Sequence, residues 1–447
     1  MKSATKTEQP VTLEHTSTHP NLLDKQHYDS HYPIRNLHEY SVFIARTIEE
    51  IEKIREGWQN LRPYPTANID YFLTELKTHS EIVRPYVLTI RNNGRLIAML
   101  VGRIEDKQIE FKVGYKPLFN PKVRVLNIIE GGIIGDTSFE VCALYMSYLQ
   151  KALQLQEADL VSFSDIPTDS YLYWLGTTQT GLISKDYEPH PNIQYRMTIP
   201  ASLEDFYSLR KNKKNLRKRV RKLEKDFSGR VAIKCYKTPQ DVNQLCQDLE
   251  KVSSKTFKKA TGDAFVNDAK TRNYLTLLAE NGHLLAYVLY IDDKPIAFEG
   301  ILKYKDVYFS HECGYDPDYE TYRPGTYLML KVIDQLSNDD QIQFMDWAAG
   351  DYEYKSRFCD LNWNVASFYI FQPSLRGIKL NAMKLFCGAS HRFGTNLLTT
   401  FKLKDKWEKF KRIQFTKQIG PTLGIFFYDT PFFEINQIWL DVIQISS

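Results

Sequence analysis

The sequence lacks several features that would assign it to a whole class of protein. Its six cysteines are scattered with no Cys-x-x-Cys pair, which excludes a cysteine zinc site and predicts reduced thiols. The chain starts without the apolar core of a signal peptide. Its apolar stretch 423–445 is a poor membrane helix, because Asp429, Glu434 and Asp441 interrupt it. We therefore expect a cytoplasmic protein, with a peripheral position at the inner membrane face as the alternative.

The chain also has little excess of charge of either sign. Its formal net charge of +4 over 447 residues is too small to indicate a nucleic-acid partner by itself. Metal-ligand clusters are missing too. The pairs His15/His19 and His27/His31 have helical spacing, but no carboxylate or cysteine supports them and Pro20 and Pro33 oppose a helix. We predict no metal.

Aromatic residues are abundant at 13%, which suits a strand-rich protein or contacts with sugars. The length allows two or three domains. Composition predicts a disordered polar tail over 1–39, an N-terminal domain over 40–190, a C-terminal domain over 191–376, and a helical and aromatic extension over 377–447. Within the extension, 377–392 and 404–417 have the pattern of amphipathic helices.

Two hairpins about 200 residues apart share a pattern. Tyr86-Val-Leu-Thr-Ile90 precedes an Asn-Asn-Gly turn, and Tyr287-Val-Leu-Tyr-Ile291 precedes Asp-Asp-Lys-Pro. A further strand, a helix and a last strand follow in each half. We interpret this as an internal duplication, although chance similarity of two hairpins remains the alternative. The predicted fold is α/β (α+β), a tandem pair of similar domains, each a mixed sheet flanked by helices.

The stretch 307–358 is the most informative part of the chain. It reads as a strand over 307–315, a turn dense in Pro and Gly, a helix over 326–336 with Thr326 near its N-cap, a strand over 343–347, and a charged loop. A Gly-containing turn before a helix N-terminus can bind an anion through backbone N–H groups. Arg323, Gly325 and Thr326 would hold it; the alternative is a plain strand-to-helix turn.

Residues 209–225 form a second charged element. From 210 to 225 there are ten basic residues and one acid, while Leu209, Leu216, Val220 and Leu223 share one helical face. This predicts an amphipathic helix with a basic exterior, either a solvated face or a surface for an anionic partner. The predicted anion-binding residues are Lys213, Lys214, Arg217 and Arg221. Candidate partners are CoA phosphates, a nucleotide- or lipid-linked phosphate, an anionic membrane surface, or RNA such as tRNA.

Over roughly 200–360 the chain resembles the GNAT-superfamily acyltransferase domain of CelD-like proteins of exopolysaccharide and cellulose biosynthesis, which is related to Fem-type peptidyl transferases. The residues that carry the resemblance are Gly314, Tyr315, Asp316, Tyr319, Pro324, Gly325, Asp346, Gly350, Tyr354 and Lys355. Arg323-Pro-Gly-Thr326 is a shortened form of that superfamily's phosphate loop.

The resemblance implies two GNAT-like domains in tandem and an N- or O-acyltransferase that uses acetyl-CoA or another acyl-CoA. Its acceptor would be a sugar, an amino-sugar or a similar polar precursor of a cell-envelope product. Two alternatives stay open: a Fem-like transferase that uses aminoacyl-tRNA, and a non-catalytic module of an envelope-polymer assembly.

Acyl transfer needs a base, a positioned donor and a stabilised oxyanion. The candidate bases are His311, Glu299, Asp346 and Asp351. Lys355 would orient the acceptor or help to hold the oxyanion. Tyr315, on a splayed strand edge, would lie beside the pantetheine arm of the donor, with Arg323, Gly325 and Thr326 at its phosphates.

Overall fold

The structure is a computed structural model, and it describes residues 39–113, 116–210, 213–256, 264–350 and 353–400. The first half (39–189) contains β1 (Tyr40–Ala45), α1 (Ile48–Glu52), α2 (Arg55–Asn60), η3 (Pro65–Ala67), α3 (Ile69–Thr78), β2 (Ile82–Asn92), β3 (Arg95–Gln108), β4 (Phe111–Val113), β5 (Lys116–Phe119), β6 (Lys122–Gly135), α4 (Phe139–Gln154), β7 (Leu160–Pro167) and α5 (Tyr171–Thr178).

The second half (190–371) contains β8 (His190–Thr198), α6 (Leu203–Ser208), α7 (Lys213–Asp226), β9 (Val231–Tyr236), η4 (Pro239–Asp241), α8 (Val242–Ser253), α10 (Ala269–Glu280), β10 (Ala286–Ile291), β11 (Lys294–Glu299), β12 (Leu302–Tyr304), β13 (Val307–Phe309), β14 (Cys313–Tyr315), η5 (Pro317–Tyr322), α11 (Pro324–Leu336), β15 (Phe344–Ala349), α12 (Glu353–Phe358) and β16 (Leu361–Phe371). The helix α13 (Leu375–Thr400) follows it.

Alternation along the central strands explains why helices cover both faces of the sheets. On β2, Tyr86, Leu88 and Ile90 pack into the core beneath α4, whereas Val87 belongs to the core of α1, α2 and α3. Successive side chains of a strand point to opposite faces, so an uninterrupted apolar run is buried on both. On β10 the same rule separates the core of α8 and α10 from that of α7 and α11.

The two halves repeat one order of elements and one set of strand pairings. In the first half, β2 and β3 form an antiparallel hairpin, β3 pairs with β6, and β7 returns parallel to β6 after α4. In the second half, β10 and β11 form the hairpin, β11 pairs with β14, and β15 returns parallel to β13 after α11. The predicted fold class, with mixed sheets flanked by helices, is confirmed.

The predicted single strand over 307–315 is wrong. The chain forms β13, leaves strand geometry over Ser310–Glu312, and resumes as β14. The two pieces pair with different neighbours: β13 lies beside β15 in the large sheet, and β14 lies beside β11 in the small one. A strand that enters two sheets must break where they diverge.

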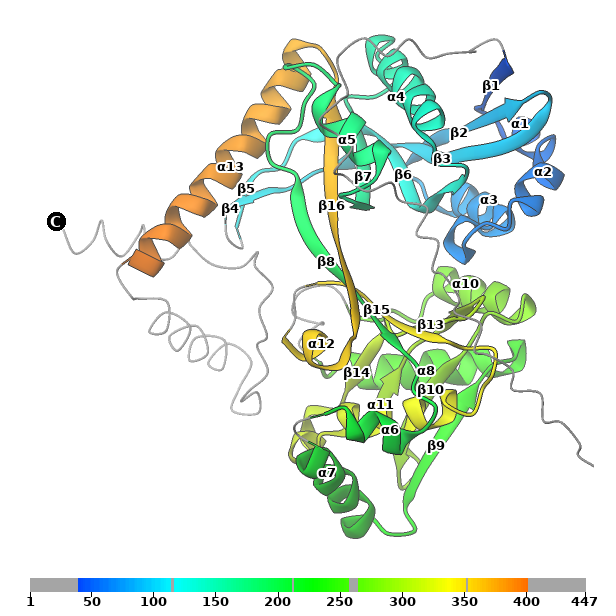
Figure 1. The fold of residues 1–447 in the computed structure, drawn as a ribbon, viewed down its shortest axis with the longest axis vertical. Coiled ribbons are helices and arrows are strands. Elements are labelled where there is room, and N and C mark those ends of the chain that lie inside the picture. Colours follow the sequence, from blue (N-terminus) through cyan, green and yellow to red (C-terminus); the bar gives the residue numbers. More distant parts are fainter. Residues whose placement is uncertain (1–38, 114–115, 211–212, 257–263, 351–352, 401–447) are drawn as a thin grey trace, which may run out of the picture.

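The halves share one ten-stranded sheet, in the order β1-β2-β3-β6-β7-β16-β8-β15-β13-β12. The strand β16 comes last in the chain, yet it lies between β7 and β8 and is antiparallel to both. In Figure 1, β8 and β16 run between the upper and lower parts of the molecule. Their pairing removes two open strand edges. The predicted boundary at residue 190 stays a prediction.

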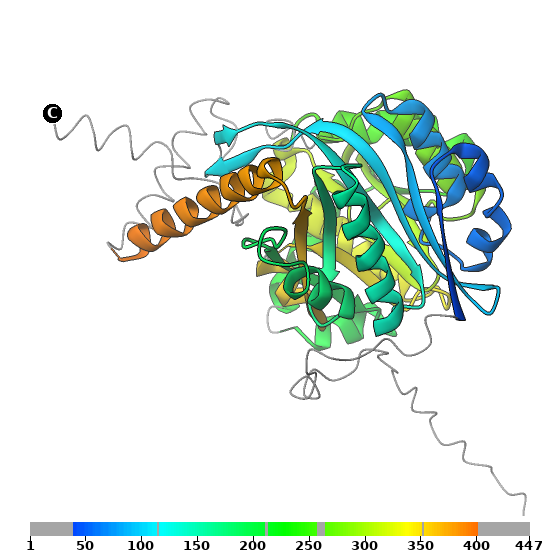
Figure 2. The same cartoon turned by 90° about the horizontal axis from the view of Figure 1, so that it is seen from above.

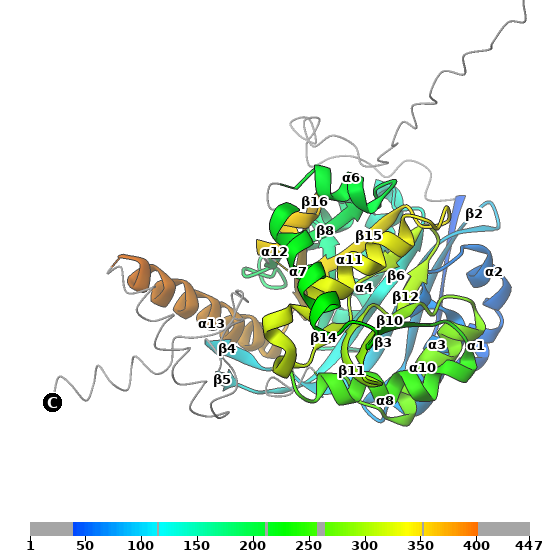
Figure 3. The same cartoon turned by 90° about the horizontal axis from the view of Figure 1, so that it is seen from below.

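The helix predicted over 377–392 is confirmed as part of the longer α13. Leu380 and Cys387 of α13 pack with Phe111 of β4 and Phe371 of β16. Figures 2 and 3 show α13 extending outward from the side of the molecule. In the described ranges, none of the helices combines the length and apolarity needed to cross a bilayer. Three segments of the prediction lie outside the described residues: the polar tail 1–39, apart from residue 39 itself, the helix 404–417 and the apolar stretch 423–445.

Candidate active site

The break between β13 and β14 brings the two sheets together at one point. The Ser310 N–H donates to the Asp346 carbonyl at 2.8 Å, which keeps the start of the break on β15. The Gly300 N–H donates to the Glu312 carbonyl at 2.7 Å, which ties its end to the chain after β11. Beyond the break β14 is the edge strand of the small sheet. The splayed strand edge expected around Glu312–Tyr315 is confirmed.

His311 and Asp346 form a pair at this break. The Nε2 atom of His311 lies 3.3 Å from Oδ1 of Asp346, and the His311 side chain is 30% exposed while the carboxylate is 2% exposed. The Asp346 carboxylate therefore orients the imidazole from the protein interior, and the ring remains accessible to solvent. A histidine oriented by a buried carboxylate is a common arrangement for a general base.

Asp346 is itself held by the neighbouring strand β8. Arg196 donates to Oδ2 through Nε at 3.1 Å and Nη2 at 2.9 Å, and Gln194 Nε2 donates to Oδ1 at 2.6 Å. The Ala348 N–H donates to the same Oδ1 at 2.9 Å. Burial raises the pKa of the Asp346 carboxyl. The hydrogen bond and charge of His311, with the charge of Arg196, outweigh burial, so the pKa lies below its usual value. Asp346 is therefore an ionised partner of His311.

Glu299 lies at the end of β11 and is 5% exposed. The Ser310 hydroxyl donates to its carboxylate, and the Tyr308 hydroxyl donates to its carbonyl at 2.7 Å. The next residue, Gly300, has φ +66°, and a Cβ there would lie 2.0 Å from the Tyr308 hydroxyl. Only glycine fits this turn, so the geometry around Glu299 depends on it.

Lys355 is placed differently from its prediction. It lies on α12, not on a loop, and its Nζ donates to the carbonyls of Ala348 and Ala349 at 3.2 and 3.1 Å. Burial lowers the pKa of the Lys355 ammonium to about 8. These contacts fix the end of β15, where Ala348 has the left-handed φ of +58°. Lys355 supports the strand that carries Asp346, and the hypothesis that it contacts the acceptor stays a prediction.

The predicted anion site lies at the other end of β14. The helix α11 begins at Pro324, two residues before its predicted start, so its N-cap is Arg323 with φ +54°. Thr326 lies in the first turn, close to the N-cap as expected. A Cβ added to Gly325 would lie 3.5 Å from the Tyr315 ring. The backbone N–H groups of Gly325 and Thr326 are in the first turn, where they have no acceptor within the helix. Helix N-termini with such N–H groups can bind anions, and the anion site at this loop stays a prediction.

The predicted basic helix is confirmed over Lys213–Asp226 as α7, and its Leu216 and Leu223 side chains are fully buried. The predicted start at 209 is wrong, because Leu209 is the C-cap of α6 and is exposed rather than on the apolar face. Lys214 and Arg221 are exposed. Arg217 pairs with Glu204 and lies over the Tyr207 ring, 4.9 Å from its centroid. The helix packs against α11 and η5, which places its positive charge near the α11 N-terminus. The Lys213 side chain lies outside the described part.

The structure thus brings His311, Asp346 and Glu299 together around the strand break. It places Tyr315, Arg323, Gly325 and Thr326 at the far end of β14, away from His311. Asp351 lies outside the described residues. Among the described residues, no group of three His, Cys or carboxylate side chains could hold a metal ion, and none of the six cysteines, all of which are described, forms a disulfide.

Two residues of this site escaped the sequence analysis, Gln194 and Arg196. Both stand on β8, where they alternate with Ile193, Tyr195 and Met197. Polar residues at i and i+2 within an apolar strand share one face. That spacing could have predicted a polar partner opposite β8, but not its identity.

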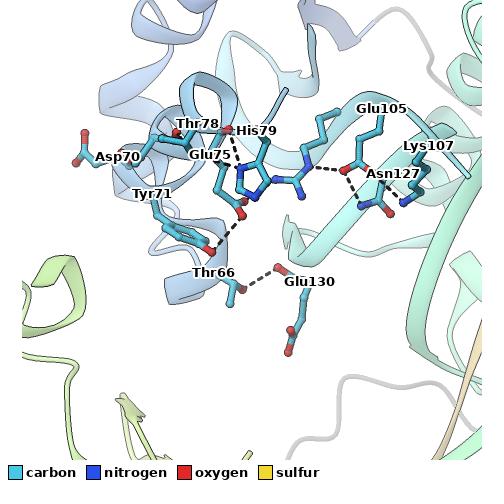
Figure 4. Close-up of polar contacts among 12 residues, drawn as sticks. Thr66, Asp70, Tyr71, Glu75, Thr78, His79, Glu105, Lys107, Asn127 and Glu130 are labelled. Atoms are coloured by element: carbon cyan, nitrogen blue, oxygen red, sulfur yellow. Dashed lines mark hydrogen bonds and ion pairs between the residues drawn. The ribbon is translucent and has the colours of Figure 1, made fainter. Parts of the chain in front are cut away.

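A second polar network lies in the first half, and Figure 4 shows several of its members. Arg103 pairs with Glu75 at 2.6 Å and with Glu105 at 2.5 Å, and Lys107 pairs with Glu105 at 2.7 Å. Burial raises the pKa of the Glu105 carboxyl, but its hydrogen bonds with Lys107 and Arg103 outweigh burial and lower it. Two acids and two bases satisfy one another here, so this network is a poorer source of a catalytic base than His311.

The family model described as an acetyltransferase (GNAT) domain matches residues 210–356. Comparison with curated proteins finds no match. Among solved structures, FemX is 8% identical with a TM-score of 0.47, over 72% of this chain and 96% of that one.

A tandem GNAT protein from the clavulanic acid biosynthesis pathway is 7% identical, with a TM-score of 0.41, over 74% of this chain and 99% of that one. The C-terminal domain of a putative lysylphosphatidylglycerol synthetase from Agrobacterium fabrum is 11% identical, with a TM-score of 0.44, over 75% and 96%. Values this low say nothing about what this chain binds or does. The family match supports a GNAT-type acyltransferase domain over residues 210–356, which include the strand break, the α11 N-terminus and Lys355.

Proposed function

We propose that the protein is an acyl-CoA-dependent N- or O-acyltransferase. The observation that carries the proposal is the His311–Asp346 pair at the break between two sheets, inside the segment that matches the acetyltransferase domain. An imidazole that is partly exposed and oriented by an ionised carboxylate suits the removal of a proton from an amine or hydroxyl near neutral pH.

In the proposed reaction, His311 accepts the acceptor's proton on Nδ1, because Nε2 faces Asp346. The acceptor nitrogen or oxygen bonds to the acyl carbon, the carbon–sulfur bond of the thioester breaks, and the leaving thiolate takes up the proton from the His311 imidazolium, directly or through water, which returns the imidazole to its neutral form. Asp346 stabilises the imidazolium that forms. Arg196 and Gln194 keep Asp346 in position, so they are positioning residues.

The donor's phosphates would lie at the N-terminus of α11, near Arg323, Gly325 and Thr326. Two features support this: backbone N–H groups converge there, and the α11 macrodipole is positive at this end. The open edge of β14 would pair with the amides of the pantetheine arm in the manner of an added strand. Acetyl-CoA is the simplest donor to test.

The proposed acceptor is a sugar, an amino-sugar or a similar polar precursor of a cell-envelope product. Aromatic rings adjoin the candidate base, with Phe309 5.2 Å from the His311 ring and Tyr64 5.3 Å from Phe309. Tyr64 belongs to the first half, so both halves contribute to the surroundings of His311. Phe309 is a core side chain, 6% exposed, so the partly exposed Tyr64 is the ring that would meet the apolar face of a sugar.

The test measures release of free CoA thiol from acetyl-CoA with a panel of amino-sugar and sugar acceptors. His311→Ala should lower turnover by roughly ten-fold to ten-thousand-fold, the range for losing an acid–base group. The matched control is His79→Ala, which removes a histidine of the first half whose Nδ1 contacts the Glu75 carbonyl. Equal turnover for both variants would refute the role of His311.

A second candidate function is a Fem-like transferase that takes its donor from aminoacyl-tRNA. The exposed basic surface of α7 favours it. A non-catalytic module is the third. A thermal-shift screen separates them, because a ligand that binds only the folded state raises the melting temperature. A shift with acyl-CoA supports the first function, a shift with tRNA alone supports the second, and no shift with either supports the third.

A further inference from the structure

The outward face of α13 carries an apolar stripe. Its members are Leu375, Ile378, Ala382, Leu385, Phe386, Ala389 and Phe393, all exposed, with spacings of three and four residues. Leu375 is 87% exposed, Phe386 57% and Phe393 61%. At 100° per residue these positions fall within about one-third of the helix circumference, opposite the buried Leu380 and Cys387.

The charges beside the stripe all have one sign. No Asp or Glu occurs in the 26 residues of α13. Lys379 and Arg392 border the stripe, and Arg376 lies farther round the helix, between Lys379 and the buried Leu380. Arg376 and Arg392 each form an ion pair with an acidic residue of the protein body, and in each pair the acidic side chain is less exposed than the arginine. Arg376 is 57% exposed and its partner Asp159 14%, while Arg392 is 58% exposed and its partner Glu188 15%. The outward surface is therefore apolar and basic.

The body holds α13 in this orientation. The Lys384 ammonium is paired with the fully buried Asp186, and the Asn381 side chain donates to the Lys185 carbonyl at 2.6 Å. Breaking a buried ion pair by rotating the helix would leave an uncompensated charge. The stripe therefore stays outward, as α13 stands at the side of the molecule in Figures 2 and 3.

We propose that this face of α13 docks the protein onto an anionic lipid bilayer. A helix with an apolar stripe bordered by lysine and arginine lies in the bilayer interface, with its apolar side chains at the acyl boundary and its cations at the headgroups. The same charges disfavour a second copy of the chain, because two such faces would bring basic residues together without acids between them. Docking would hold the protein, with its proposed acyltransferase site, at a membrane surface.

The test is co-sedimentation of the full chain with vesicles of phosphatidylcholine alone and with about one-third phosphatidylglycerol. The protein should sediment with the anionic vesicles and much less with the neutral ones. Ile378→Ser combined with Phe386→Ser should weaken the partition about ten-fold or more, because two apolar side chains no longer enter the lipid. Lys379→Gln should weaken it several-fold at low salt only. The matched control is Val83→Ser, which removes a 49% exposed apolar side chain from β2.

Three results would overturn the proposal. The first is that the chain does not bind anionic vesicles. The second is that the Ile378/Phe386 variant binds them as well as the unchanged protein, which would place the membrane contact elsewhere. The third is that sedimentation shows an oligomer of the unchanged protein and a monomer of this variant, which would assign the face to a second copy of the chain. All substituted positions are exposed, but the Phe386 ring also contacts the Phe119 ring of β5, with 6.3 Å between centroids. Circular dichroism and the melting temperature therefore check that folding is kept.

Discussion

Replacing Lys355 by Met tests whether its ammonium is buried at a cost. Burial lowers the pKa of Lys355 from 10.5 to about 8 in the folded protein. The unfolded chain then binds more protons than the folded one between these values, so stability rises as pH rises from about 8 to 10.5. At pH 7 the lysine is protonated in both states, and the penalty is present.

The size of the effect follows from the two pKa values. A shift of this size gives a penalty of about 3 kcal/mol at pH 7, of which roughly 2.5 kcal/mol should have vanished at pH 10. Met is close to lysine in shape and carries no charge. The stability of the unchanged protein relative to Lys355→Met should therefore increase by about 2.5 kcal/mol between the two pH values.

The assay is urea unfolding of both proteins at pH 7 and pH 10. Other groups titrate in both proteins alike, so their contributions cancel in the difference. Lys379→Met is the matched control, because Lys379 is exposed. The difference in stability between the unchanged protein and this variant should not change with pH. If Lys355→Met showed the same small change as the control, Lys355 would be solvated and its role in holding the end of β15 would be wrong.

Four further predictions concern the site. Gly300→Ala should destabilise the protein by about 1–3 kcal/mol in urea unfolding, because φ is +66° and the added Cβ meets the Tyr308 hydroxyl. Arg196→Met should raise the pKa of the Asp346 carboxyl, because the arginine charge that helps to lower it is lost; NMR titration of this carboxyl measures the shift, which a purely structural role would not give. Arg323→Ala should weaken acetyl-CoA binding, measured by calorimetry, and leave turnover at saturation nearly unchanged. Changing the basic residues of α7 to Gln should lower the affinity for anionic ligands and make that affinity less dependent on salt. These residues are Lys213, Lys214, Arg217 and Arg221.

Local patterns in the sequence predicted the elements well where the signal was local. The hairpin of β10 and β11 follows from Tyr287 to Ile291 and the polar turn after it, since both strands need only each other to pair. The basic helix follows in the same way, because Leu216 and Leu223 share a face without reference to the rest of the chain.

The sequence was less informative where a neighbour from a distant part of the chain decides the structure. The break between β13 and β14 is visible afterwards as the polar triplet Ser310, His311 and Glu312 after three apolar residues. That triplet alone cannot show that two sheets diverge there. Arg196 was missed for a related reason, because its partner Asp346 lies 150 residues away, and no spacing rule links them.

The position of β16 sets the order in which the molecule can be completed during synthesis. Domains generally fold from the N-terminus as the ribosome releases the chain. The sheet of the first half, however, has an unpaired edge at β7 until residues 361–371 emerge. A nascent chain of about 350 residues therefore has its hairpins and helices but exposes the edges of β7 and β8, which are templates for pairing with other chains. Both halves become complete in one late step, when a single strand closes the gap between them.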